Sequence, residues 1–253
     1  MSSTTTGLIS AGGIFGGALL GLALQRIVPD HHLGKDSHEI VKLGAGLIAT
    51  LTALILGLLI SSAKISFDAM NASIVQGGAK IILLDRALAS YGPAAAATRL
   101  QLKHAVAGGI EEVWPSHQRG MPGLAAFERR SDMEVVQQQL RELEPQNAAQ
   151  RQLLAQAQQL ATDLAQTRWL LIEQSQSQLP TPFLVVLLSW LVLLFVTFGL
   201  FAPRNATLIT VLLAYALSVS AALFLVIDMN RPLEGIISLS NAPMRKALEI
   251  IGR

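Results

Sequence analysis

The sequence has 253 residues, of which 51% are hydrophobic and only 14% are charged. A soluble globular domain has about 25% charged residues, so this composition excludes an ordinary soluble protein and indicates a membrane protein. Lys and Arg number 19 and Asp and Glu number 17, a net charge of +2 that excludes a large basic surface for nucleic acid. The absence of cysteine excludes disulfides, thiol nucleophiles and zinc–thiolate sites.

Four apolar stretches are long enough to cross a bilayer as helices, which takes about 20 residues. They cover residues 7–28, 41–63, 183–202 and 206–227. The first is expected to remain as an uncleaved helix, because residues 1–6 carry no Lys or Arg and no signal-peptide cleavage site follows. Only Pro203, Arg204 and Asn205 separate the last two stretches, which predicts an antiparallel transmembrane hairpin.

Four crossings would place both termini and the polar region between the second and third stretches on one side of the membrane. Lys and Arg near the membrane ends are more numerous on that side, which favours the cytoplasm. We therefore expect an all-α integral membrane protein with four transmembrane helices and a cytoplasmic helical bundle inserted between helices two and three. The expected parts are a first helix pair (1–63), the cytoplasmic domain (64–182), a second helix pair (183–227) and a cytoplasmic C-terminal tail (228–253).

Helical periodicity runs through the cytoplasmic domain. A seam with coiled-coil spacing consists of Phe67, Met70, Ile74, Gly77, Ile81, Leu84, Leu88 and Tyr91. No helix breaker precedes it, so one helix is predicted from about residue 40 to residue 91, where Gly92 and Pro93 end it.

Three further helices are predicted after this one. The first covers residues 94–110, the second carries Met133, Val136, Leu140 and Leu143, and the third has Pro145 in its first turn. The third repeats the seam at Leu153, Ala157, Leu160, Leu164, Thr167 and Leu171. Such seams fit an intramolecular bundle and also fit contacts between subunits, and the sequence leaves both open. The short amphipathic segment after Pro243 is expected to dock on this bundle.

Within the membrane stretches, glycines and the lack of ionisable residues are informative. Gly12, Gly13, Gly16, Gly17 and Gly21 form overlapping G-x-x-x-G pairs, which favour close helix packing either inside a subunit or between subunits. Ion-coupled transporters use Asp, Glu or His at depth, and none lies inside these four stretches, so active transport is disfavoured. A passive pore remains, and it needs a symmetric oligomer because four apolar helices cannot surround water alone.

The second stretch is the preferred pore-lining helix. Its polar Thr50 and Thr52 lead to this assignment, and the candidate pore-lining residues are Thr50, Leu54, Gly57 and Ser61.

Other candidate sites are weaker. His31, His32 and His38 lie among carboxylates in the first loop and form a weak candidate for a metal site or a pH sensor, although a solvated loop explains them better. Asp85 and Arg86 lie off the seam, either as a solvated surface pair or as a partner of the C-terminal tail. No motif for a catalytic site, a phosphate loop or a dinucleotide is present, so we expect neither an enzyme nor a cofactor.

Three segments together resemble a known family. They are His38-Glu39 leading into Leu56-Gly57-Leu58-Leu59, then Leu84-Asp85-Arg86 with Tyr91-Gly92-Pro93, and finally Asp228-x-x-Arg231-Pro232-x-x-Gly235-x-Ile237-x-x-Ser240. This pattern is similar to an uncharacterised bacterial membrane family described as bestrophin-like, over residues 38–249. The family-motif residues are Asp85, Arg86, Asp228, Pro232 and Gly235.

The resemblance implies a function that the residues alone do not indicate. Bestrophins are pentameric anion channels whose second transmembrane helix lines the pore. The second stretch here has no aromatic neck, and the acidic calcium clasp of animal bestrophins has no evident counterpart, so anion selectivity rests on the resemblance alone.

The leading hypothesis is a homo-oligomeric, passive channel of the bacterial inner membrane that conducts inorganic anions such as chloride, and the resemblance implies a pentamer. The alternative is a non-conducting membrane scaffold or sensor that recruits partners through its cytoplasmic helices. The partners expected in either case are the lipid bilayer and further copies of the chain.

Overall fold

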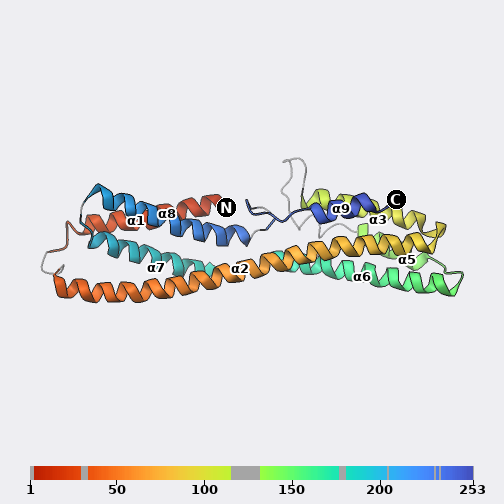
Figure 1. Ribbon diagram of the computed structural model, residues 1–253, viewed down its shortest axis with the longest axis horizontal. Coiled ribbons are helices and arrows are strands. Elements are labelled where there is room, and N and C mark those ends of the chain that lie inside the picture. The colour runs from red at the N-terminus through yellow and green to blue at the C-terminus, as the bar shows by residue number, and fades with distance from the viewer. Residues whose placement is uncertain are drawn as a thin grey trace. The chain divides into compact units, whose positions relative to one another are not determined.

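The computed structural model describes residues 3–29, 34–114, 132–176, 181–203, 205–230, 232–233 and 235–252. Regular structure in these ranges is entirely helical and contains no strand, which confirms the all-α fold class. The helices are α1 (Ser3–Leu24), α2 (Lys35–Tyr91), α3 (Ala96–Val113), α5 (Asp132–Glu142), α6 (Ala148–Gln176), α7 (Thr181–Leu200), α8 (Ala206–Met229) and α9 (Ala242–Ile250) (Figure 1). A 3₁₀ turn at Pro93–Ala95 joins α2 to α3.

Four of the described helices contain stretches long and apolar enough to cross a membrane. These stretches are Thr5–Leu24, Ser37–Tyr91, Pro182–Leu200 and Ala206–Met229, and each overlaps one of the four predicted from the sequence.

The ends of two of these helices differ from the prediction. α1 ends at Leu24 rather than at residue 28, because the turns that follow are tighter: the Arg26 N–H donates to the Ala23 carbonyl three residues back. Pro29 then disfavours helical geometry in the residue before it. α8 begins after Asn205, whose side chain accepts a hydrogen bond from the Leu208 N–H at 2.8 Å, and it continues to Met229 instead of ending at residue 227.

The chain forms two compact units. Unit 1 comprises Met1–Ile65 and Gln178–Asn230, and unit 2 comprises Ser66–Ser177 and Arg231–Arg253. The helices α1, α7 and α8 belong to unit 1, α3, α5, α6 and α9 belong to unit 2, and α2 contributes residues to both.

In unit 1, α1 packs against both α7 and α8 (Figure 1). Ile14 and Ala18 of α1 are fully buried there. The backbones of α1 and α7 touch, because a side chain at Gly21 would collide with the Val196 carbonyl and one at Gly199 with the Ala18 carbonyl. Small residues at the crossing permit this approach, which favours helix association in lipid.

The core of unit 2 is built on the predicted seam of α2. Every seam residue from Met70 to Tyr91 is buried, and Phe67 packs against the same face. Residues of α3, α5 and α6 complete this core, among them Leu102, Val136, Leu140 and Ala157. The seam is therefore filled from within one chain, which confirms the intramolecular bundle as the role of these residues.

The C-terminal helix docks on the same bundle, as the amphipathic pattern after Pro243 predicts. Ala247 and Ile251 are fully buried in the core of unit 2, and α9 contacts α3. Two glycines of α2 make room for it: a side chain at Gly77 would meet the Met244 methyl group, and one at Gly78 the Pro243 carbonyl, each at 3.0 Å.

Helix α6 starts later than the sequence predicted. The prediction placed Pro145 in the first turn of this helix, whereas α6 begins at Ala148 and Pro145 lies before it. The helix starts where Asn147 accepts a hydrogen bond from the Gln150 N–H at 2.8 Å, while the Gln150 side chain accepts one from the Gln146 N–H at 2.8 Å. This reciprocal capping satisfies backbone donors that a helix starting at Pro145 would leave without partners.

The buried face of α6 also differs by part of a turn from the predicted seam. The buried residues are Leu154, Ala157, Ala161, Leu164 and Ile172. Of the predicted residues, Leu153, Leu160 and Leu171 lie at the partly buried edge of that face. A helix that meets two neighbours buries a wider stripe than a strict heptad seam, so adjacent positions share the burial.

Candidate functional site

The four residues proposed to line a pore share one exposed face of α2. Thr50, Leu54, Gly57 and Ser61 follow at spacings of four, three and four, which places them along one side of a helix. All four are exposed, and Leu54 exposes 60% of its surface. Apart from the adjoining turns of α2 itself, no described part of the chain lies within 4 Å of a methyl group placed at Gly57. The Thr50 hydroxyl donates to the Gly46 carbonyl at 2.9 Å, so its hydrogen-bonding need is met within the helix.

Thr52 lies on the opposite side of α2. Only 4% of its surface is exposed, and its hydroxyl donates to the Ile48 carbonyl at 2.7 Å. Leu59 and Ala63 share this buried face, which therefore packs within unit 1. Thr52 therefore does not share the exposed face of the four candidate pore-lining residues.

The apolar part of α2 is much less covered than the other candidate spans. Only 11% of the residues in its apolar window are buried, compared with 28% in each of α1, α7 and α8. Leu43, Leu47 and Leu58 are among the exposed residues. One chain therefore leaves most of this helix available to lipid or to further copies of the chain.

The glycines of α1 divide into two sets. Gly17 and Gly21 face α7, where Val192 and Val196 lie against them. Gly12, Gly13 and Gly16 are exposed, and apart from the adjoining turns of α1 itself no described part of the chain lies within 4 Å of a methyl group at any of them. The G-x-x-x-G pattern thus serves packing inside the chain with one set and leaves the other set open.

Asp85 forms a buried ion pair that the sequence analysis did not anticipate. Its carboxylate, 1% exposed, accepts two hydrogen bonds from Arg99 of α3: Nε to Oδ1 at 2.8 Å and Nη2 to Oδ2 at 3.0 Å. The hydrogen bond to Asp85 raises the pKa of the Arg99 guanidinium above its usual value, so Arg99 stays charged. The Gly252 N–H approaches Oδ2 at 3.5 Å, so the C-terminal tail also meets this carboxylate. The neighbouring Arg86 is exposed.

A cation for Asp85 could have been expected from the sequence, although Arg99 could not be singled out. Asp85 follows the fully buried seam residue Leu84, and a buried carboxylate is almost always paired. Periodicity within α2 does not identify which residue of another helix supplies the charge.

The family-motif residues near the C-terminus fall into both units. Asp228 belongs to unit 1, lies in the last turn of α8 and is completely buried. The sequence predicted that the fourth apolar stretch ends at residue 227 and contains no carboxylate. Because α8 continues to Met229, this candidate span does contain one carboxylate, Asp228, in its last turn.

Pro232 organises a loop in unit 2. Its carbonyl accepts the Leu239 N–H at 2.8 Å, and the Leu239 carbonyl accepts the indole N–H of Trp114 at 2.9 Å. Gly235 lies within this loop and is partly exposed. The loop thus joins the tail to the end of α3, and Trp114 is a residue that the sequence motifs did not reveal.

The histidines do not assemble into a site among the described residues. His31 and His32 lie outside the described ranges. The ring of His38 packs edge-on against Phe201 with 4.6 Å between ring centroids. In the parts of the chain that the structure describes, no three His, Asp or Glu side chains are grouped as metal ligands.

These features define a class: an all-helical chain with four candidate membrane spans and a helical unit inserted between the second and third of them. The bestrophin-like domain matches residues 12–244, and the chain therefore belongs to the bestrophin-like family. Neither a curated protein nor a solved structure matches it. The family and the four apolar helices together support a membrane protein.

Proposed function

We propose that this protein is a homo-oligomeric, passive ion channel that conducts inorganic anions such as chloride. The observation that carries the proposal is the exposed face of α2 with Thr50, Leu54, Gly57 and Ser61, which has no cover from the chain's described residues. Membership of the bestrophin-like family supports the same conclusion, because bestrophins conduct anions.

An oligomer is part of the proposal. The helices of one chain leave α2 largely uncovered, and a ring of copies would turn these faces toward a common axis. A hydrophobic helix face can line a pore that opens by wetting, with Thr50 and Ser61 as its polar positions. Five copies are the number expected from bestrophins.

The location proposed is the bacterial inner membrane. Residues 1–63 and 183–227 supply the two transmembrane pairs, and residues 64–182 and 228–253 lie in the cytoplasm. Support comes from the excess of Lys and Arg near the membrane ends of the polar segments.

Reconstitution tests this function. The purified protein is placed in liposomes loaded with chloride, and efflux is compared with that of protein-free liposomes and of liposomes loaded with gluconate. The native mass of the detergent-solubilised complex is measured in parallel. We expect a complex of at least four chains and chloride efflux well above both controls; a monomer, or a ring that releases no chloride, contradicts the proposal.

A non-conducting scaffold is the second candidate, and one observation favours it. Trp169 and Leu170 are adjacent on α6 of unit 2 and both are exposed, which is typical of a surface that binds another protein. This function predicts a stable complex without ion flux, so the same liposome experiment separates the two candidates.

A further inference from the structure

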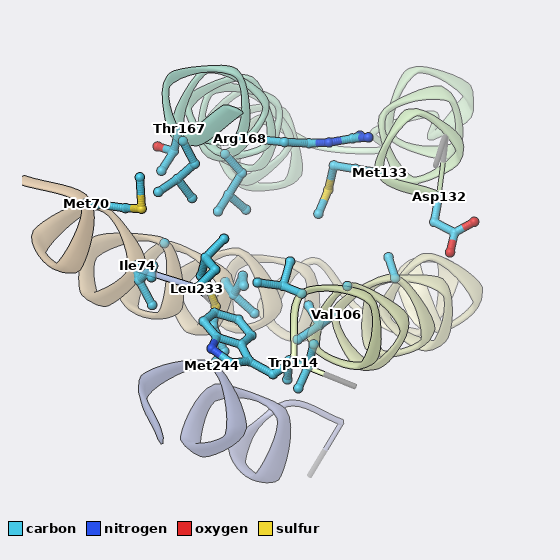
Figure 2. Close-up of a pocket in the computed structure, with 18 residues that line it drawn as sticks. Met70, Ile74, Val106, Trp114, Asp132, Met133, Thr167, Arg168, Leu233 and Met244 are labelled. Carbon is cyan, nitrogen blue, oxygen red and sulfur yellow. The ribbon is translucent and has the colours of Figure 1, made fainter. Parts of the chain in front are cut away.

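Unit 2 contains a partly open pocket with a cavity volume of about 110 Å³ that the proposed function does not use. It lies among α2, α3, α5, α6 and α9 (Figure 2). Residues from distant parts of the sequence reach it, including Met70 of α2, Val106 of α3, Met133 of α5, Leu233 of the tail and Met244 of α9.

The wall of the cavity is almost entirely hydrocarbon and thioether. Only four polar side chains occur among the lining residues: Trp114, Asp132, Thr167 and Arg168. Three methionines contribute, and their flexible side chains adapt to a guest of variable shape. An ordered water makes two to four hydrogen bonds, and this wall offers few groups to make them, so an apolar occupant displaces water from it at little cost.

The polar side chains of the wall already have partners within the chain. The Trp114 indole N–H donates to the Leu239 carbonyl at 2.9 Å. The Thr167 hydroxyl donates to the Asp163 carbonyl at 2.8 Å and accepts the Lys80 ammonium at 3.4 Å. Asp132 and Arg168 also take part in interactions within the chain, and their opposite charges leave the wall formally neutral. One atom of Arg168, Nε, is buried and makes no hydrogen bond to any described residue. A polar or ionic ligand that used Trp114 or Thr167 would have to displace their existing hydrogen bonds, which disfavours it.

We propose that this cavity is a binding site for a small, uncharged apolar molecule, of the size of a single aromatic ring or a short alkyl chain. An apolar cavity of about 150 Å³ in another protein stays dry and takes up benzene, so a cavity of this size is suited to a compact guest. The site contacts α2 through Met70, Ile74 and Ile81, so an occupant touches the same helix that carries the proposed pore face. The inference does not depend on ion conduction.

The tryptophans of the protein provide a direct test. The chain has three tryptophans, and replacing Trp169 and Trp190 by phenylalanine leaves Trp114 in the cavity wall as the only one. Bromobenzene is the probe, because it is neutral and its heavy atom quenches the fluorescence of a tryptophan that it touches. We expect saturable quenching of Trp114 that excess benzene reverses.

Two further variants locate the site. Val106→Phe fills the cavity and should raise the apparent Kd for bromobenzene by about tenfold or more. Val135→Phe makes the same change at an exposed position of α5 and should leave the Kd unchanged. Should Val106→Phe fail to fold, Val106→Ala replaces it: this variant enlarges the cavity and should bind at least as tightly as the parent.

Several results would overturn the inference. Quenching that rises in proportion to the probe and is not reversed by benzene reports partition into detergent and not a site. Equal affinity in the Val106→Phe and Val135→Phe variants, or weaker binding in Val106→Ala, also overturns it.

Discussion

Removing Arg99 tests whether Asp85 is held as a buried, charge-paired carboxylate. Arg99→Ala deletes both hydrogen bonds, at 2.8 and 3.0 Å, and leaves a carboxylate that is 1% exposed without its cation. Breaking a buried pair by removing one partner destabilises a protein by about 3–5 kcal/mol. The Arg99 side chain is 22% exposed, so water reaches the vacated position and the lower end of this range, about 3 kcal/mol, is expected.

The assay is thermal unfolding of the full-length protein in mild detergent, followed by circular dichroism. For a chain of this size, 1 kcal/mol shifts Tm by roughly 2–4 °C, so Arg99→Ala should lower Tm by roughly 6–12 °C. The matched control is Arg86→Ala, which removes an exposed arginine next to Asp85 and should change stability by no more than about 0.5 kcal/mol.

A double variant tests whether the loss of stability comes from leaving a buried charge without its partner. Asp85→Leu combined with Arg99→Met removes both charges, so no charge remains buried alone, and this protein should be more stable than Arg99→Ala. The reasoning is refuted if Arg99→Ala unfolds at the same temperature as Arg86→Ala, because Asp85 would then have no need of Arg99.

Three further predictions concern single positions. Gly199→Val introduces a side chain at the contact with α1 and should destabilise the protein by about 1–3 kcal/mol, while Gly16→Val, at an open position, should leave Tm unchanged; equal effects in thermal unfolding would contradict the α1–α7 packing. Thr50→Lys adds a positive charge to the exposed face of α2 and should change chloride efflux from liposomes roughly twofold or more, whereas unchanged efflux removes this face from the pore. Asn147→Ala removes the cap of α6 and should lower the free energy of unfolding by about 1 kcal/mol; an unchanged free energy of unfolding would mean that this hydrogen bond does not stabilise the helix start.

The long helices could be predicted from the sequence because the burial of one helix face imposes a regular spacing on the apolar residues. The seam from Met70 to Tyr91 alternates three and four residues apart since one face of α2 contacts the rest of unit 2, and Gly92 ends the helix at φ 112°, a conformation that glycine readily adopts. The start of α6 was predicted incorrectly because Pro145 and Asn147 are both signals for a helix start, and the hydrogen bonds of Asn147 decide between them.

The spacing of residues within one helix did not predict which residues of other helices they contact. Five glycines with the same spacing in α1 gave no indication of which set meets α7, because that choice depends on where Gly199 and the Val196 carbonyl lie. Arg99 was missed for the same reason, since its partner Asp85 lies on another helix. Both Thr50 and Thr52 suggested α2 as the pore-lining helix, but only Thr50 is exposed, because two threonines two residues apart project to different sides of a helix.

Cysteine modification can show whether the exposed face of α2 lines an ion pathway. The protein has no cysteine, so Leu54→Cys and Thr52→Cys each introduce a single reactive thiol. Chloride efflux from liposomes is measured before and after adding a charged methanethiosulfonate reagent. We expect modification to block efflux through the Leu54→Cys protein and to leave the Thr52→Cys protein unaffected. Block at Thr52 alone, or no block at Leu54, would contradict a pore lined by this face.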